Sequence, residues 1–455
     1  MNILVINGSP KGKNSITLQT SLFFEKLTEK HTFSFLHAGQ KIKYYEKNMS
    51  EAISLINNAD LIIFSYPVYT FIAPSQLHHF INLMKNCGED FSKKFVTQIS
   101  TSKHFYDTTA HRYIEDNCFD MGMKVIKGLS ADMDDLTTEK GRKEAIAFMK
   151  HTLWCVKNDV YEKIPDKKIC QQKEYIPIKS ERLKVRNGTV ALVCDIREDD
   201  DRLISMVADF EEKCPYEVKE VNIRNFQFSG GCLGCFNCAA DGKCIYKDGF
   251  DEYLRNEIQS SKAIVYAFSI EDHSMGWRFK MYDDRQFCNG HRTVTEGMPF
   301  GYIINGAYEN EENLRTVIEG RSEVGHNFLA GVGHTPETLD NMVKNLDYAI
   351  ENKLVLPRNF YGVGGMKIFR DLIWVMRGLM KADHEFYKQH GVYDFPHKQT
   401  GRMLAMCLVG EAMRNPKLKS KMGGKMTEGM LMPYKKIFDD IDKKRAASGK
   451  SHRTD

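Results

Sequence analysis

Four cysteines lie within thirteen residues near the middle of the chain, where the sequence reads GGCLGCFNCAADGKC from Gly230. They are Cys232, Cys235, Cys238 and Cys244, with the spacing Cys-x2-Cys-x2-Cys-x5-Cys. Thiolates at two-residue gaps can close around one metal centre, and four of them suit a 4Fe–4S cluster or a tetrahedral zinc ion. Three close cysteines with a nearby fourth favour the cluster over zinc, and four reduced cysteines without a metal are the third interpretation.

A polar loop near the amino terminus has the composition of an anion site. It runs from Gly8 to Ser15, between a short apolar strand and a helix signal. Backbone N–H groups in such a loop can face an anion, and the helix N-terminus adds partial positive charge. Ser9, Asn14 and Ser15 add donors, and Lys11 adds charge. The spacing is neither that of a P-loop nor that of a dinucleotide fingerprint, so the loop predicts a phosphate site, with an ordinary polar turn as the alternative.

A second loop follows the next apolar strand and contains Pro67, Val68 and Tyr69. In a doubly wound sheet, ligands bind at the carboxyl ends of the strands. A Pro-Val-Tyr turn at this place presents backbone amides and an aromatic face to a flat ring. The two loops together therefore predict a ligand that carries both a phosphate and a planar ring.

The composition is that of a globular protein with more than one domain. The chain has 455 residues, 42% hydrophobic and 27% charged, with a net charge of +4. No apolar run has the length of a membrane helix, and Met1 leads directly into a strand signal, without a signal peptide. Most of the twelve cysteines are scattered singly. We therefore expect reduced cysteines, a cytoplasmic location, no transmembrane segment and no nucleic-acid partner.

Strand and helix signals alternate over the first 155 residues, and the alternation restarts near residue 187. This pattern predicts parallel sheets wrapped by helices. The stretches 58–64 and 261–267 show the repeat, because each is a helix end followed by a strand. We predict an α/β protein with two doubly wound parallel sheets in tandem and a C-terminal helical extension. The predicted boundaries are 1–155 and 187–355 for the two domains, 156–186 for a linker and 356–455 for the extension.

The individual elements follow from the spacing of apolar residues. The predicted strands are 3–6, 60–65, 94–99, 189–194, 217–223, 262–268 and 300–305. The predicted helices are 16–30, 50–57, 75–86, 110–121, 139–155, 201–212, 250–259, 275–285, 314–325, 336–352, 367–381 and 401–414.

The last hundred residues have a different character. From Pro357 onwards there are twenty Lys and Arg against ten Asp and Glu. We interpret the methionine-bearing helices as packing against the α/β core, and Tyr361–Gly365 as a helix-entry turn. His384, Tyr387 and His390 share one helical face and are interpreted as packing or surface residues. The excess of positive charge indicates a solvated face, with anionic lipid or an acidic partner as the alternative. The tail from Lys443 is predicted to fray.

The first 155 residues resemble the flavodoxin-like NAD(P)H-dependent FMN reductases. The resemblance rests on Gly8-Ser9-Pro10-Lys11 with Asn14-Ser15, followed by Pro67-Val68-Tyr69 and by Pro74-Ser75-x-Leu77-x-x-Phe80-Ile81. It implies FMN, with the phosphate at Ser9, Lys11, Asn14 and Ser15 and the ring against Pro67, Val68 and Tyr69. A third loop with Thr101 and Ser102 would approach the pyrimidine end of the flavin. Members of the family often carry an Asp-Arg pair after the next helix, where this half has Asn82-Leu83.

Residues 188–335 resemble the iron–sulfur flavoproteins, relatives with the same fold. The resemblance rests on the cysteine loop, on Lys247-Asp248 and on a helix that ends in Asp284-Arg285. It implies FMN and a 4Fe–4S cluster. In place of the phosphate loop this half has five carboxylates between Asp195 and Asp201, which would repel a phosphate. We therefore predict flavin in the first half only and the cysteine site in the second.

Together these features predict an FMN-dependent oxidoreductase that passes hydride from NAD(P)H through FMN to an acceptor such as a quinone, a free flavin or a nitro compound. No catalytic side chain is expected, because the flavin carries the chemistry. The alternatives are an iron–sulfur flavoprotein that carries electrons between protein partners, and a non-catalytic flavodoxin-like scaffold. The two halves are expected to form an intramolecular pseudo-dimer, in which the cysteines lie near the flavin, and further homo-oligomerisation stays open.

Overall fold

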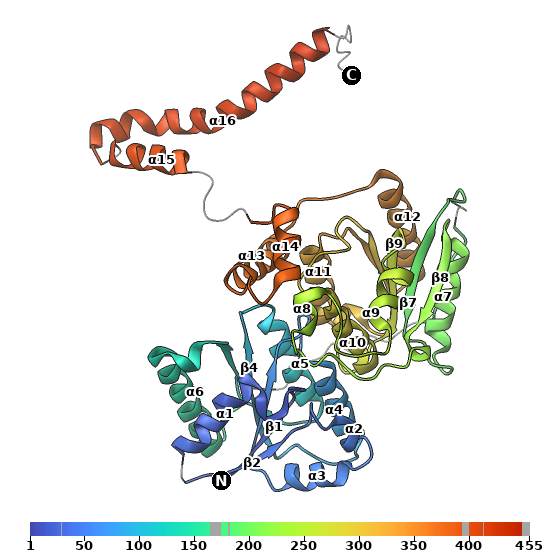
Figure 1. Cartoon of the computed structure of the whole chain (residues 1–455), viewed down its shortest axis with the longest axis vertical. Helices are drawn as coiled ribbons and strands as arrows, with labels where there is room; N and C mark the ends of the chain where they lie inside the picture. Colours follow the sequence, from blue (N-terminus) through green and yellow to red (C-terminus); the bar gives the residue numbers. More distant parts are fainter. Residues whose placement is uncertain (29, 164–173, 181–182, 394–399, 413, 448–455) are drawn as a thin grey trace. The chain divides into compact units, whose positions relative to one another are not determined.

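The computed structural model describes residues 1–28, 30–163, 174–180, 183–393, 400–412 and 414–447 (Figure 1). These residues fall into two units, Met1–His390 and Gly391–Asp455. The predicted linker 156–186 is therefore described only in part. Within it, Tyr175 is buried and donates a hydrogen bond from its hydroxyl to Asp209 Oδ2 at 2.6 Å, so this part of the linker packs on the second domain.

The amino-terminal domain is built on a parallel sheet with the strand order β2-β1-β3-β4-β5, and β6 pairs with the far end of β4. This is the flavodoxin-like order, and the predicted fold is confirmed. The strands are β1 (Asn2–Asn7), β2 (Thr32–Leu36), β3 (Leu61–Pro67), β4 (Phe95–Ser102), β5 (Lys124–Val125) and β6 (Leu129–Asp132).

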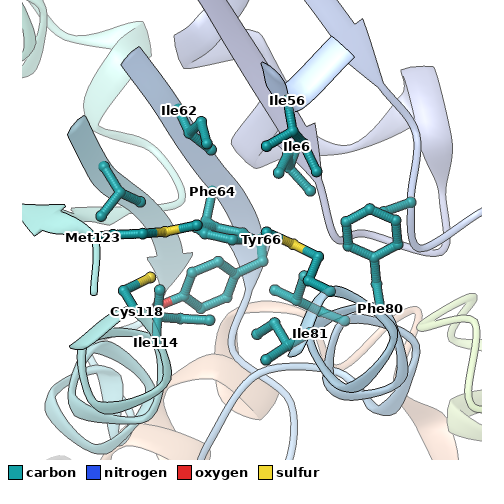
Figure 2. Packing of buried hydrophobic residues seen from close by; sticks show 14 of the residues in the cluster. Ile6, Ile56, Ile62, Phe64, Tyr66, Phe80, Ile81, Ile114, Cys118 and Met123 are labelled. Carbon is teal, nitrogen blue, oxygen red and sulfur yellow. The ribbon is translucent and has the colours of Figure 1, made fainter. Parts of the chain in front are cut away.

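Helices cover both faces of this sheet because successive residues of its central strands alternate between two hydrophobic clusters. Ile62, Phe64 and Tyr66 of β3 point to the side that also holds Phe80 and Ile114 (Figure 2). The intervening residues of the same strand pack with α1 and α6 on the other side. The helices are α1 (Ile16–Leu27), α2 (Ile42–Tyr45), α3 (Met49–Asn57), α4 (Ser75–Lys85), α5 (Asp107–Asp120) and α6 (Glu139–Asn158).

The second domain repeats the same topology, with the strand order β8-β7-β9-β10-β11. Its strands are β7 (Thr189–Cys194), β8 (Glu217–Asn222), β9 (Ala263–Ser269), β10 (Phe300–Asn305) and β11 (Leu329–Gly333). Its helices are α7 (Asp201–Lys213), α8 (Asn237–Asp241), α9 (Phe250–Tyr253), α10 (Gly276–Arg285), α11 (Glu312–Gly325) and α12 (Pro336–Asn352). The first strand of each domain pairs with the second and the third, so the predicted repetition of one α/β fold is confirmed.

The differences from the sequence prediction concern short edge elements and the C-terminal helices. The predicted helix 367–381 is observed over Phe360–Val375, and the helices Lys381–Gln389 and Pro416–Ala447 were not predicted. β2, β5, β6 and β11 were not predicted, because each is five residues or fewer and only partly apolar. The predicted helix 250–259 is a single α-turn that continues as a π-helix over Leu254–Ile258. Short 3-10 turns occur at Gly12–Asn14, Asp135–Thr137, Ile223–Asn225, Gln286–Asn289 and Tyr308–Asn310.

The C-terminal extension is divided between the two units. Helices α13 (Phe360–Val375) and α14 (Lys381–Gln389) belong to the first unit, and α15 (Thr400–Ala412) and α16 (Pro416–Ala447) to the second. Residues 443–447, predicted to fray, are the last turn of α16, and residues 448–455 lie outside the described residues. No described helix combines the length and the apolar character that a membrane crossing requires.

The glycine-rich segment Tyr361–Gly365 lies inside α13, so the interpretation as a turn ahead of a helix was wrong. Its glycines allow α13 to approach α11 closely. A Cβ at Gly362 would lie 2.5 Å from the carbonyl oxygen of Glu323, and a Cβ at Gly365 would lie 2.6 Å from Val324. Close helix packing therefore explains these glycines.

Candidate functional site

One cavity of about 210 Å³ gathers most of the residues predicted to do chemistry. It is lined by residues of both domains and by helices α13 and α14. The predicted residues in its wall are Ser9, Lys11, Ser15, Pro67, Val68, Tyr69, Thr101, Ser102, Cys232, Cys235, Cys238 and Cys244. Asn14 is the one predicted site residue that does not line the cavity, and its side chain is exposed at the end of the 3-10 turn.

The amino-terminal loop is held in shape by Asn7, the last residue of β1, which the sequence analysis missed. Asn7 is fully buried, its Oδ1 accepts a hydrogen bond from Ser9 N at 3.1 Å, and its Nδ2 donates one to Gly12 O at 2.8 Å. Ser15 caps α1 by accepting a hydrogen bond from the backbone N–H of Leu18. The loop therefore ends at a helix N-terminus, where an anion is favoured.

Lys11 brings a positive charge from this loop to the cysteine segment. Its Nζ lies 5.3 Å from the centroid of the Phe236 ring. Burial lowers the pKa of Lys11, and the nearby Cys235 and Cys232 thiols act in the opposite direction. No ion-pair partner of Lys11 is found among the described residues, so its ammonium group is available to an anionic ligand. This agrees with a phosphate site.

The Pro-Val-Tyr loop is a tight, strained turn. Tyr69 and Ile72 exchange backbone hydrogen bonds at 2.7 and 3.2 Å, and Thr70 and Phe71 have φ angles of 40° and 75°, in the region that favours glycine. Backbone strain of this kind, of the order of 1–3 kcal/mol per residue, persists only where the surroundings enforce it. Here the second domain supplies the enforcing contacts.

Two charged residues of α10 hold this turn across the domain interface. The carboxylate of Asp284 accepts hydrogen bonds from Thr70 Oγ1 at 2.6 Å and from Ser75 N at 2.7 Å. Lys280 Nζ donates to Tyr69 O at 3.0 Å and pairs with Asp284. Both side chains are fully buried, and burial raises the pKa of Asp284 while the Lys280 charge opposes the increase. Asp284, in the Asp-Arg pair that ends α10, thus binds the Pro-Val-Tyr loop of the first domain, which we call the flavin loop.

Arg285, the next residue, fixes both ends of the cysteine segment. It pairs with both carboxylate oxygens of Asp248 at 2.7 and 2.8 Å and donates to Gly230 O at 3.0 Å. Burial raises the pKa of Asp248, but hydrogen bonds from Arg285 and from the backbone outweigh it, so the pKa lies at about 2. One short stretch of α10 therefore orients the flavin loop and the cysteine segment together.

The third predicted loop contributes polar groups from the end of β4. Thr101 Oγ1 lies 2.5 Å from Thr17 Oγ1 of α1. Ser102 is buried, and its Oγ has no hydrogen-bond partner in the part of the chain that the structure describes. A buried hydroxyl without a partner in a cavity wall indicates a polar ligand. The residues present therefore fit FMN, with a phosphate at the first loop and the ring at the other two.

The cysteine segment packs directly on the flavin loop. Gln76 Nε2 donates to Cys232 O at 3.2 Å, and Tyr69 Oη donates to Leu233 O at 3.5 Å. Gly234 has a φ of 60°, and a Cβ there would lie 1.8 Å from Tyr69 Oη. Only glycine satisfies both conditions, so the segment is shaped to lie against Tyr69.

The four cysteines share the cavity without converging on one point. Cys238 Sγ donates to Phe287 O at 2.9 Å, Cys232 Sγ accepts from Gly234 N at 3.4 Å, and Cys235 is exposed. Within the described residues, no three His, Cys, Asp or Glu side chains are arranged around a common metal position. Burial raises the pKa of Cys238 to about 11, and a thiol must lose its proton to bind a metal. The donor chemistry suits a cluster, but this arrangement is not a preformed metal site.

The cavity also contains residues that sequence reasoning missed. Cys288 is a fifth, buried thiol in its wall, 44 positions beyond Cys244, and no spacing pattern links it to the others. Further lining residues come from segments with no recognised motif, namely Phe105, Phe287, His291, Ile368, Phe369, Leu372 and Asp383. Only the tertiary structure brings them to the site.

The corresponding loops of the second domain are occupied by ion pairs. Arg224 Nε lies 2.6 Å from Asp195 Oδ1, and Arg197 pairs with Glu271 and, at 3.5 Å, with Asp200. Glu271 and Ser274 exchange the same backbone hydrogen bonds as Tyr69 and Ile72. The carboxylate of Glu271 therefore occupies the position that the ring of Tyr69 has in the first domain. The absence of flavin from this half stays a prediction, and the structure adds that arginines pair with several of the loop carboxylates.

Comparison with known proteins identifies the first domain. A family model described as NADPH-dependent FMN reductase matches residues 1–134. Residues 1–134 are therefore similar to the FMN reductase family. The predicted resemblance, and with it an enzyme of the NAD(P)H-dependent FMN oxidoreductase type, is confirmed for this domain.

A curated relative and two solved structures also match about a third of this chain or slightly more. An iron–sulfur flavoprotein from Archaeoglobus fulgidus is 28% identical over 193 residues, which cover 40% of this chain and 87% of that protein. One similar solved structure is an apo NADH:FMN oxidoreductase, with 17% sequence identity and a TM-score of 0.29 over 33% of this chain and 87% of that chain. Another is an NAD(P)H:quinone oxidoreductase from Methanothermobacter marburgensis, with 13% sequence identity and a TM-score of 0.28 over 36% of this chain and 98% of that chain.

Proposed function

We propose that the protein is an FMN-dependent NAD(P)H oxidoreductase that passes electrons to a small-molecule acceptor. The observation that carries the proposal is the shared cavity, in which three loops of the FMN reductase family domain face the cysteine segment of the second domain. Bound FMN would supply the capacity to accept a hydride from NAD(P)H and to return two electrons to the acceptor.

The side chains bind and orient the cofactor in this proposal. Ser9, Ser15 and Lys11 would hold the phosphate, and Lys11 would also neutralise part of its charge. Lys280, which donates to Tyr69 O, and Asp284, which accepts from Thr70 Oγ1, would keep this loop in one conformation against the ring. Thr101 and Ser102 would meet the polar edge of the ring. Helices α13 and α14 complete the wall of the cavity.

The two halves act as an intramolecular pseudo-dimer in this proposal. Helix α10 contacts the loop after β3, and α4 contacts the loop after β9 in return. On that second side, Asn82 Nδ2 donates to Asp272 Oδ2 at 2.9 Å and Lys85 pairs with Asp272 at 3.1 Å. His79 of α4 stacks on Trp277 of α10 with ring centroids 3.7 Å apart. The reciprocal contacts support a two-fold relation in which one half retains the flavin site.

The second candidate function is an iron–sulfur flavoprotein that delivers electrons to a protein partner. The cysteine spacing and the name of the Archaeoglobus relative favour it, and the four thiols line the same cavity as the flavin loops. The thiols would have to move and lose protons to bind a cluster. The proposed reaction above does not require a cluster.

The absorbance spectrum and metal content of the full chain, purified without oxygen, test these proposals. Flavin absorbance, about one FMN per chain and NAD(P)H oxidation with ferricyanide are expected. Iron and sulfide near four per chain, with absorbance that dithionite bleaches, would select the second candidate. A colourless protein that does not take up added FMN would overturn both and leave a scaffold.

A further inference from the structure

Two helices of the second unit expose large apolar side chains. They are α15, with 13 residues, and α16, with 32 residues (Figure 1). Ten large apolar residues, four on α15 and six on α16, are between 42% and 73% exposed. Those of α15 belong to the continuous apolar run from Met403 to Val409. Single exposed apolar residues are ordinary, but a group of this size typically marks an interaction surface.

Most of the exposed apolar residues of α16 lie on one side of the helix, because they recur at intervals of three and four residues. We call this group the apolar stripe: Leu431, Tyr434, Ile437, Phe438 and Ile441. Charged residues occupy the positions between them, at 435–436, 439–440 and 442–444. This part of α16 is therefore amphipathic, and its apolar side is exposed.

The same two helices carry the excess positive charge of the chain. Residues 400–447 contain eleven Lys and Arg against five Asp and Glu, whereas the rest of the chain contains 53 against 55. Between Glu411 and Glu428 there are five basic residues and no acidic residue. We call these five the basic segment: Arg414, Lys417, Lys419, Lys421 and Lys425. The positive charge is thus concentrated in the helices that expose the apolar side chains.

An anionic lipid surface matches both features. A helix of this kind can bury its apolar side chains at the boundary between headgroups and acyl chains, while neighbouring cations contact anionic headgroups. Tyr434 suits this boundary, because it combines an apolar ring with a polar hydroxyl. No described helix is long and apolar enough to cross a membrane. The helices would therefore lie along the surface.

The charge of these helices disfavours a second copy of the chain as the partner. A second copy would bring the same excess of six positive charges to the contact, and like charges that meet at an interface oppose association. Anionic lipid instead supplies the opposite charge at high density. A fluid lipid surface also accepts the exposed side chains of both helices without a groove of complementary shape.

We propose that α15 and α16 bind the surface of a membrane that contains anionic lipid. The apolar stripe and the exposed residues of α15 lie at the boundary of the acyl chains, and the basic segment contacts the anionic headgroups. The helices thereby hold the two α/β domains at the membrane. This binding goes beyond the proposed function and does not depend on FMN.

Cosedimentation of the full chain with lipid vesicles tests the proposal. One set of vesicles contains phosphatidylcholine alone, and the other contains about 30% phosphatidylglycerol. The Kd should be at least about tenfold lower for the anionic vesicles, since each basic residue near an anionic surface strengthens binding about fivefold. NaCl at about 0.5 M should weaken this binding, because salt screens exposed charges. A chain that does not sediment with the anionic vesicles, or that binds both sets equally, would overturn the proposal.

Phe438→Ser tests the apolar stripe, with Phe360→Ser on α13 as the matched control. Phe438 is 62% exposed and Phe360 is 85% exposed, so general adhesion would depend on Phe360 at least as strongly. Phe438→Ser should raise the Kd for the anionic vesicles about tenfold, because the burial of one phenylalanine side chain is lost. Phe360→Ser should leave this Kd unchanged, and both variants should keep the unfolding temperature of the unmodified chain. Equal effects of the two substitutions on the Kd would rule out the apolar stripe as the contact.

Lys417→Gln combined with Lys421→Gln tests the basic segment. The control combines Lys47→Gln with Lys93→Gln, which removes two exposed lysines of the first domain. The first pair should raise the Kd for the anionic vesicles about twentyfold at low salt, and the control pair less than about threefold. This difference should disappear at about 0.5 M NaCl. An equal increase in both pairs would show that only the net charge of the chain matters, which contradicts a basic segment at the headgroups.

Other occupants of the apolar stripe would give different results. If a second copy covers it, the unmodified chain forms a dimer in the analytical ultracentrifuge, Phe438→Ser dissociates the dimer, and the anionic vesicles are not bound. If an acidic protein covers it, polyglutamate binds the full chain and the anionic vesicles do not. Either result would overturn the proposal.

Discussion

At the residue scale, the charge on Lys11 is the feature that most directly links the structure to a cofactor. Lys11 has no ion-pair partner among the described residues and lines the cavity at the loop that precedes α1. Replacing Lys11 by Met should weaken FMN binding by about 1.5–3 kcal/mol, roughly ten- to hundredfold in Kd, because a charge-assisted hydrogen bond to phosphate is lost. Fluorescence titration of the apoprotein with FMN measures this change.

Lys13 provides the matched control for this experiment. It lies in the same loop but is exposed and outside the cavity. Lys13→Met should alter the FMN Kd by less than about a factor of three, since a screened surface charge contributes little. Equal effects of the two substitutions would show that Lys11 acts only through the general positive charge of the loop.

His273 makes the stability of the chain depend on pH. Burial lowers its pKa, but hydrogen bonds to Asp120 and Glu311, at 2.7 and 3.0 Å, and the charges of both residues raise it to about 9. A raised pKa in the folded state stabilises the protein fully below the unfolded pKa of about 6.5, and this contribution disappears as the pH rises through 9. We expect a loss of at most about 3 kcal/mol between these pH values. The free energies of unfolding in urea of the unmodified chain and of His273→Gln should approach each other above pH 9 and differ most below pH 7. A difference between the two free energies that does not change with pH would contradict this prediction.

At the element scale, the cysteine segment is shaped by glycines that fit the flavin loop. Gly234→Ala should destabilise the protein and reduce FMN content, because the added methyl group would overlap Tyr69 Oη. Gly249→Ala is the control, since Gly249 has a similar φ of 76° but no atom within 4 Å of an added Cβ. The control should lose only about 1–2 kcal/mol through its backbone conformation. Thermal unfolding and bound flavin measure both variants, and identical losses would exclude a role for the contact with Tyr69.

At the scale of the whole molecule, the domain interface decides which half has a rigid flavin loop. Asp284→Asn removes one of the two carboxylates that pair with the buried Lys280, the other being Asp283 at 3.3 Å. The loss of stability should therefore lie below the about 3–5 kcal/mol that breaking an isolated buried pair costs. The substitution should also release the strained turn at Thr70 and Phe71 and lower FMN occupancy. The control is Asp272→Asn at the reciprocal position, where the paired Lys85 is partly exposed. This variant should retain FMN, and loss of FMN from both would contradict the assignment of the flavin to the first half.

Much of the architecture could be predicted from the sequence because it depends on local periodicity. Strands such as Thr189–Cys194 and Phe300–Asn305 begin and end where the apolar runs do, since both faces of a parallel sheet are covered by helices. Short edge strands such as Leu329–Gly333 were missed, because half-exposed residues carry no such run. The flavin loops were found because their residues lie at the ends of predicted strands, where the topology of the sheet brings them together.

The sequence by itself therefore determined the repeated α/β fold, the three loops of the family domain and the existence of a four-cysteine segment. Only the tertiary structure decided that Tyr69 and Thr70 are held by Lys280 and Asp284, more than 200 positions away, and that Phe369 and Asp383 complete the cavity. The physical reason is that local patterns record which residues are buried within an element, whereas contacts between domains depend on how their surfaces fit. No spacing rule encodes that fit, because the partners are fixed by packing and charge pairing across the interface.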